Sequence, residues 1–114
     1  MVTAQAHPMN KTIAIDFDHT WTADPSLWNL FHKFATERGH RIIMVTARQF
    51  GTISEAEAKR NSLPKAMPII YTGGKLKEEH AMRLGYKVDI WIDDMPGMIQ
   101  KCLVLETPNN DKDL

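Results

Sequence analysis

Two aspartates, Asp16 and Asp18, stand one residue apart at the end of an apolar run near the start of the chain. The run, residues 13–15, is Ile-Ala-Ile without a polar interruption, which predicts a strand buried on both faces. Side chains alternate along an extended chain, so the two carboxylates would point to the same side. Carboxylates that close repel each other unless a cation or hydrogen-bond donors lie between them. A turn or helix-cap role is the alternative, because aspartate is common where a strand ends.

A second acidic pair, Asp93 and Asp94, ends a later apolar run. Four aspartates gathered at one edge of a sheet, in a chain of zero formal net charge, indicate a bound cation. Mg²⁺ is the expected ion, because it prefers hard oxygen ligands. Asp94 has an alternative role as the cap of a short helix predicted at Pro96.

The elements that must position these side chains alternate between strands and helices. Strands are predicted at residues 13–15, 41–45, 69–71, 88–92 and 102–106, and helices at 25–38, 53–61, 75–84 and from 96. This alternation predicts an α/β fold of three layers, Rossmann-like, with a mainly parallel sheet of about five strands. Ligands bind such sheets beyond the carboxyl ends of the strands, where Asp16, Thr46 and Asp93 are expected.

Two local signals refine the predicted helices. Asp24 followed by Pro25 predicts the N-cap and first position of a helix that Gly39 closes. Apolar residues at helical spacing should form its core face: Leu27, Leu30, Phe31, Phe34 and Ala35, with Trp28 beside them. Residues 52–55 have capping-box spacing, which predicts that Thr52 caps the second helix.

Four short motifs, taken in order, resemble those of the haloacid dehalogenase-like superfamily. Residues 16–20 (Asp-x-Asp-x-Thr) resemble its first motif, Thr46 at the end of a strand its second, Lys75 its third, and residues 91–94 (Trp-Ile-Asp-Asp) its fourth. The resemblance runs from about residue 11 to about residue 107. Most members of that superfamily transfer phosphoryl groups through an aspartyl phosphate, so the resemblance implies a Mg²⁺-dependent hydrolase of phosphoric monoesters.

The resemblance also implies roles for individual residues. Asp16 would be the nucleophile and a metal ligand. Asp18 would offer its backbone carbonyl to the metal and its side chain as general acid and then general base. Asp93 and Asp94 would complete the metal shell.

Two further residues would bind the transferring phosphoryl group. Thr46 would donate its hydroxyl and backbone N–H to a phosphoryl oxygen. Lys75 would place a positive charge against the phosphate, with Lys77 as the rival lysine. Lys75 is preferred because it follows the Gly73-Gly74 turn directly.

The sequence departs from the superfamily pattern beside the nucleophile. His19 stands where glycine is usual, and Trp21 stands where a smaller apolar residue is usual. Trp21 and Arg48 are expected near the rim of the site, where they would contact substrate or a partner. Packing is the alternative for Trp21, and an exposed position at the start of a helix is the alternative for Arg48.

Composition narrows the class of protein. The 114 residues suffice for one domain, predicted at 11–107 between a flexible leader (1–10) and a flexible tail (108–114). Balanced charge without a basic block argues against a nucleic-acid or membrane surface. Cys102 is the single cysteine, so no internal disulfide can form, and a reducing, cytoplasmic location is expected. Residues 1–10 lack the features of a signal peptide.

A phosphatase is the leading hypothesis, and two alternatives come from other classes. A receiver-like phosphoacceptor domain uses similar residues in a different order, and a catalytically silent metal- or phosphate-binding domain would keep the site without turnover. Residues 92–96 (Ile-Asp-Asp-x-Pro) resemble deoxyribonucleotidase-like members, which favours a nucleotide monophosphate, with a sugar phosphate as the alternative. The short connections leave no room for a cap domain, so a neighbouring subunit or a large phosphorylated substrate is expected to close the site.

Overall fold

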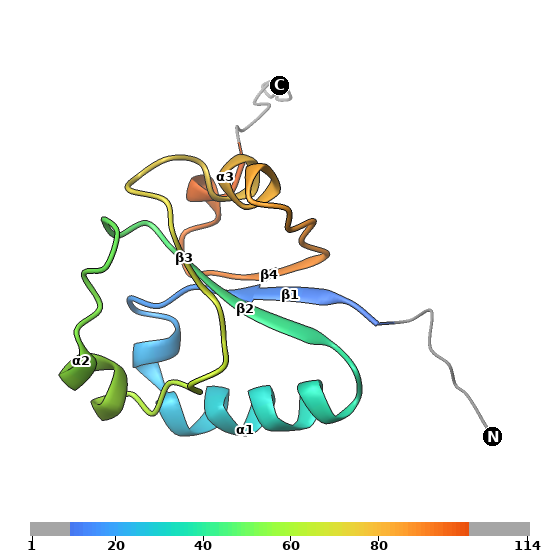
Figure 1. The fold of residues 1–114 in the computed structure, drawn as a ribbon, viewed down its shortest axis with the longest axis vertical. Helices are drawn as coiled ribbons and strands as arrows, with labels where there is room; N and C mark the ends of the chain where they lie inside the picture. Colours follow the sequence, from blue (N-terminus) through green and yellow to red (C-terminus); the bar gives the residue numbers. More distant parts are fainter. Residues whose placement is uncertain (1–9, 101–114) are drawn as a thin grey trace, which may run out of the picture.

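The computed structural model of this chain describes residues 10–100. Within them, four parallel strands form one sheet in the order β3-β2-β1-β4 (Figure 1). The strands are β1 (Thr12–Ile15), β2 (Arg41–Thr46), β3 (Ile69–Tyr71) and β4 (Ile90–Ile92). The predicted parallel, Rossmann-like α/β architecture is confirmed. The predicted fifth strand (102–106), the tail (108–114) and nearly all of the leader lie outside the described residues.

The strand register brings distant segments to one edge of the sheet. Ile15 of β1 is paired with Met44 of β2 and with Ile92 of β4, so the three strands end side by side. The Asp16 N–H continues the ladder by donating to the Ile92 carbonyl at 3.0 Å. The segments that follow β1, β2 and β4 therefore meet at the carboxyl edge, as the parallel topology requires.

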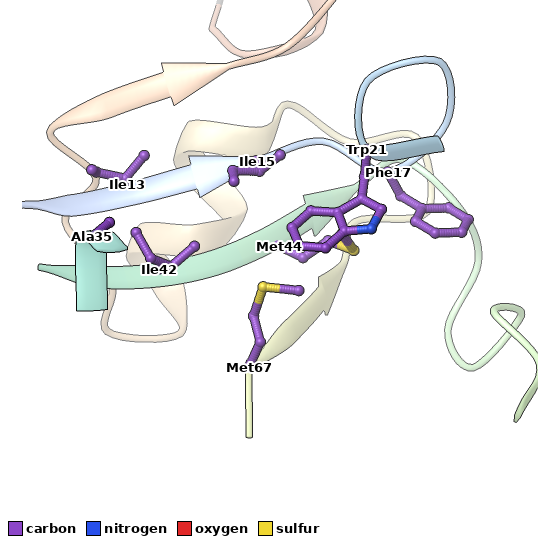
Figure 2. Close-up of a cluster of buried hydrophobic side chains, with 8 residues drawn as sticks. All are labelled: Ile13, Ile15, Phe17, Trp21, Ala35, Ile42, Met44 and Met67. Atoms are coloured by element: carbon purple, nitrogen blue, oxygen red, sulfur yellow. The ribbon is translucent and has the colours of Figure 1, made fainter. Parts of the chain in front are cut away.

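Helices cover both faces of the sheet. Helix α1 (Pro25–Glu37) packs on one face and α3 (Lys77–Arg83) on the other (Figure 1), while the short α2 (Glu55–Arg60) follows β2. Successive residues of β1 and β2 point to opposite faces, and each face carries its own apolar cluster. The first cluster, on the α1 side, is Ile13, Ile15, Phe17, Trp21, Ala35, Ile42, Met44 and Met67 (Figure 2). The second, on the α3 side, is Ala14, Ile43, Val45, Ile70 and Ala81.

Helix α1 begins as predicted, but its inward face differs from the prediction. The Asp24 carboxylate accepts a hydrogen bond from the Leu27 N–H at 3.2 Å, and Gly39 (φ 93°) follows the helix. Trp28, Phe31 and Ala35 pack toward the sheet, whereas three residues predicted for the core are about half exposed: Leu27, Leu30 and Phe34. Apolar residues cover more than one stripe of this helix, so periodicity alone does not decide its rotation. The bulky Trp28 decides the rotation of the helix, because its indole N–H donates to the Thr20 carbonyl at 2.9 Å.

The other two helices begin two residues later than predicted. Ser54, not Thr52, caps α2, because the Ser54 hydroxyl accepts from the Glu57 N–H at 3.0 Å. The start of α3 moves from residue 75 to Lys77, because Gly73 and Gly74 both have positive φ and prolong the preceding turn. Strand β4 is likewise shorter than predicted, and the helix predicted from Pro96 is one 3₁₀ turn, η3 (Pro96–Met98). Along residues 10–100, no helix has the length and apolar character needed to cross a membrane.

Candidate functional site

A cavity of about 200 Å³ lies at the carboxyl edge of the sheet. Its walls come from the segments after β1, β2 and β4 and from the start of α3. The lining residues are Asp16, Asp18, His19, Thr46, Ala47, Lys77, Asp93, Asp94, Met95 and Met98. The sheet edge thus brings together seven of the residues singled out in the sequence, from segments up to 78 positions apart.

Three carboxylates converge in this cavity. Asp16, Asp93 and Asp94 each offer one oxygen, and these oxygens all lie within 4.8 Å of one another. Thr20 joins Asp16 to Asp94: its hydroxyl lies 3.2 Å from Asp16 Oδ2 and 3.0 Å from Asp94 Oδ1, and it accepts from the Asp94 N–H. The Met95 N–H donates to Asp93 Oδ1 at 2.9 Å. Hydrogen bonds therefore hold the three carboxylates in fixed positions, and the group could bind a metal ion.

Lys77 is the lysine of this site. Its ammonium group is buried, with the side chain only 2% exposed, and Nζ donates to Asp16 Oδ1 at 2.8 Å and to Asp93 Oδ2 at 2.5 Å. Lys75, which the sequence analysis preferred, is exposed and does not line the cavity. The late start of α3 explains the difference, since Lys75 still belongs to the Gly73-Gly74 turn and donates its N–H to the Thr72 carbonyl.

The charge of this group is not balanced by its own side chains. Three ionised carboxylates face one ammonium group, which leaves an excess of two negative charges. Burial raises the pKa of Asp16 to about 6, against the opposing effect of Lys77, whereas the pKa of Asp94 is lowered by its neighbours, the Asp16 carboxyl group first and the Thr20 hydroxyl after it. A divalent cation bound to carboxylate oxygens would compensate this excess. The donor set therefore fits a hard metal ion.

The Asp18 carboxylate does not belong to this group. The chain turns after Asp16, with the Trp21 N–H donating to the Asp16 carbonyl, so strand alternation does not continue to Asp18. Both Asp18 oxygens instead accept from Arg48: Oδ2 from Nε and Oδ1 from Nη2, each at 2.9 Å. The extended geometry on which the expectation of a shared side depended ends at Asp16; both side chains line the cavity, but Asp18 is bound by Arg48 and does not join the other carboxylates. Metal binding by the Asp18 backbone carbonyl stays a prediction.

Arg48 is held by a second carboxylate that sequence analysis missed. Glu57 on α2 accepts from Nη1 at 2.8 Å and from Nη2 at 2.7 Å, and the guanidinium carbon lies 5.0 Å from the centre of the Phe17 ring. Hydrogen bonds to Asp18 and Glu57 raise the pKa of Arg48 further above its ordinary value, and the bond from Arg48 lowers the pKa of Glu57. Nothing in the sequence distinguishes Glu57 from the neighbouring charged residues of its helix.

Trp21, Thr46 and His19 were also singled out in the sequence, and the structure shows where each of them lies. Trp21 is fully buried in the first cluster, with its indole N–H donating to the Asn61 carbonyl at 2.8 Å, so its predicted place at the rim is wrong (Figure 2). Thr46 lines the cavity as expected, and its hydroxyl accepts from the Arg48 N–H at 3.3 Å. His19 has φ 65°, a conformation that favours glycine, which explains why glycine would suit this position.

Comparison of the chain with protein-family models, with curated proteins and with solved structures gave no match. We therefore infer a function from the chemistry of the side chains at the carboxyl edge of the sheet. Two charged groups carry it. We call Asp16, Lys77, Asp93 and Asp94 the lysine cluster, and Asp18, Arg48 and Glu57 the arginine cluster.

Proposed function

We propose that this chain is a Mg²⁺-dependent phosphatase of the haloacid dehalogenase-like type, which hydrolyses a phosphomonoester through an aspartyl phosphate on Asp16. The observation that carries the proposal is the buried Lys77 ammonium between Asp16 and Asp93, with Asp94 beside them in an open cavity. A nucleophilic carboxylate and a site for cations are thereby placed next to each other, as phosphoryl transfer to an anionic group requires.

Mg²⁺ would be held by carboxylate oxygens of Asp16, Asp93 and Asp94 and by the Asp18 backbone carbonyl. When bound, it would neutralise part of the charge of the phosphoryl group. Lys77 has three N–H donors; among residues 10–100, Asp16 and Asp93 accept from two of them, so the third can donate to a phosphoryl oxygen. The Thr46 hydroxyl at the end of β2 would donate to another.

The chain's own groups account for both steps of the reaction. An Asp16 carboxylate oxygen attacks phosphorus, the ester P–O bond breaks, and Asp18 transfers a proton to the departing alkoxide. Asp18 then takes a proton from a water molecule as that water attacks the phosphorus of the aspartyl phosphate. Inorganic phosphate leaves, the Asp16 carboxylate is restored, and Asp18 is again protonated.

The position of each residue along the chain favours this assignment over a receiver-like phosphoacceptor domain. In receiver domains an acidic pair follows the first strand and the lysine follows the last one. Here Lys77 precedes β4, and the adjacent pair Asp93 and Asp94 follows it. A catalytically silent metal-binding domain is the second candidate, because both oxygens of Asp18 are engaged by Arg48.

A nucleotide monophosphate or a small sugar phosphate is the proposed substrate, with a phosphorylated macromolecule as the alternative. Within residues 10–100, β1 and β2 are joined through η2 (Trp21–Ala23) and α1, and β2 and β3 through α2, so neither connection contains a cap domain. The proposed site is open, and a second copy of the chain or the substrate itself would close it. Trp21 is no longer a candidate for that contact, since it is buried.

Turnover of 4-nitrophenyl phosphate, with and without Mg²⁺, tests the proposal. Wild-type protein should hydrolyse the ester only with the metal, and Asp16→Asn should lose at least about 10³-fold in kcat/KM, because an amide cannot serve as the nucleophile. Glu79→Gln on the exposed side of α3 is the matched control and should keep full activity. Comparable turnover by Asp16→Asn would exclude Asp16 as nucleophile. A wild type that binds Mg²⁺ without hydrolysing any ester would be the silent domain.

A further inference from the structure

The Arg48 guanidinium uses all five of its N–H groups. Nε donates to Asp18, Nη2 to both Asp18 and Glu57, and Nη1 to Glu57 and to the Thr52 carbonyl. Each carboxylate is bound through two oxygens, the geometry in which an arginine–carboxylate pair is strongest. The arginine cluster therefore holds Asp18 in one orientation.

This orientation conflicts with the acid–base role of Asp18. Each Asp18 oxygen accepts a hydrogen bond from Arg48 along a fixed direction, so the carboxylate cannot turn toward a leaving group in the cavity while both bonds are kept. At least one Asp18 oxygen must therefore separate from Arg48 before Asp18 can transfer a proton to a leaving group. Its side chain is the most exposed of the three at 42%, and it lines the cavity, so it has room to turn.

Release of Asp18 would leave Arg48 with one carboxylate. Glu57 and the Thr52 carbonyl would still accept from the guanidinium, and the Arg48–Glu57 pair would stay neutral. Without the charge of Glu57, Asp18 would be the only anion beside the arginine, and its release would leave an unpaired, partly buried cation.

We propose that Glu57 is a positioning residue, which fixes and neutralises Arg48 so that Asp18 can leave the pair and act as acid and base. The inference rests on the phosphatase function proposed above and adds a residue to it.

Hydrogen bonds to neighbouring residues fix the backbone of Glu57. The Ser54 hydroxyl accepts from its N–H at 3.0 Å, and Asn61 Nδ2 donates to its carbonyl at 2.9 Å. Asn61 is in turn tied to the core, because its own carbonyl accepts from the buried Trp21 indole. These contacts attach α2 to the core and fix the backbone position of Glu57, whose carboxylate binds Arg48.

The Glu57→Gln variant tests the proposal through its response to the leaving group. Nitrophenolate departs without a proton, whereas an alkoxide needs the acid, so loss of acid catalysis appears only with alkyl esters. We expect kcat/KM for an alkyl phosphate to fall about tenfold, while kcat/KM for 4-nitrophenyl phosphate stays within about twofold. Glu55→Gln on the same helix is the matched control, because Glu55 is not a partner of Arg48. The ratio of kcat/KM for the alkyl phosphate to kcat/KM for 4-nitrophenyl phosphate should be unchanged in this variant.

The outcomes separate the two proposals. A wild type with normal turnover and a Glu57→Gln variant with an unchanged ratio, or with equal losses on both esters, would overturn the positioning role alone. Absence of wild-type turnover with every ester would remove the proposed function and this inference with it. Glu57→Asp retains the charge and should keep the ratio within about threefold of the wild type.

A second measurement on the wild type covers the case in which Glu57→Gln does not fold. The Arg48 Nε–H has Asp18 as its acceptor, whereas the Nη1–H groups face Glu57 and Thr52. Mg²⁺ and orthovanadate, at concentrations that inhibit turnover, should shift the Nε–H resonance of Arg48 and leave the Nη1–H resonances in place. An Nε–H resonance that stays unchanged in the inhibited protein would show that Asp18 never leaves Arg48.

Discussion

The lysine cluster and the arginine cluster lie at the same edge of the sheet, and each places one cation against more than one carboxylate. In the lysine cluster the side chains of Lys77, Asp16 and Asp93 are at most 9% exposed. In the arginine cluster those of Arg48, Glu57 and Asp18 are 26%, 22% and 42% exposed. In the first group Lys77, Asp16 and Asp93 are shielded from water while Asp94 is exposed, and the group keeps an excess of two negative charges. The second group has an excess of one and is partly exposed throughout.

The chemistry of the two cations explains the difference. An ammonium group is compact and has three donors, so it fits between two buried carboxylates and leaves space for a further ligand. A guanidinium group is planar, and all five of its donors are used here, so it has no donor left for a further ligand. The excess of negative charge around Lys77 favours the binding of a metal ion. The partly exposed network around Arg48 instead fixes the orientation of Asp18 and Glu57. Substitutions in the two clusters should therefore differ in their effects on stability and metal binding.

Loss of the buried cation should have the largest effect on stability. Lys77→Met leaves Asp16 and Asp93 facing each other without compensation, so the metal-free protein should lose about 3–5 kcal/mol of unfolding free energy. Lys75→Met, at the exposed lysine two residues away, should change it by less than about 0.5 kcal/mol. Urea titrations with a chelator present give both values, and equal losses in the two variants would contradict the assignment of Lys77.

The pH dependence of stability should also come from the lysine cluster. The pKa of Asp16 is raised by burial from 3.8 to about 6, so the folded chain binds more protons than the unfolded chain between these values. Metal-free stability should therefore fall by about 2–3 kcal/mol as the pH rises from about 4 to 6, and level off above that range. Denaturant titrations across this pH range measure the slope. Asp16→Asn should remove it, while Glu57→Gln should retain it.

Metal binding should stabilise the protein mainly through the carboxylates of the lysine cluster. At a Mg²⁺ concentration one hundred times its Kd, the unfolding free energy should rise by about 2.7 kcal/mol. Asp93→Asn should abolish most of this increase, because it removes a carboxylate of the group, whereas Glu57→Gln should keep it. Thermal melts with and without Mg²⁺ decide the matter, and an unchanged melting temperature in the wild type would argue against a metal site.

Loss of the arginine should have the smallest effect. Arg48→Met removes a partly exposed ion pair that solvent screens, so the unfolding free energy should fall by only about 1 kcal/mol. Added salt should narrow the difference from the wild type, since exposed charges are screened within about 10 Å at 0.1 M salt. A loss as large as that of Lys77→Met, insensitive to salt, would show that the two clusters do not differ as described.

Features that follow from local pattern could be predicted from the sequence. The apolar runs of β1 and β2 indicated strands buried on both faces, and Asp24 with Pro25 marked the start of α1. A parallel sheet followed from the alternation of elements, and it placed Asp16, Thr46 and Asp93 at one edge. Each of these inferences depends on neighbouring residues or on a general rule of topology.

Choices between similar residues were decided only by the tertiary structure. Two positive-φ glycines delayed the start of α3 and brought Lys77, rather than Lys75, to the carboxylates. Trp28 set the rotation of α1, and η2 turned Trp21 into the core instead of the rim. The Asp18 carboxylate pairs with Arg48, 30 residues later, and not with the carboxylates around Lys77, while Glu57 binds the same guanidinium. Partners of charged side chains depend on distances between separate elements, and those distances are absent from the local pattern of a sequence.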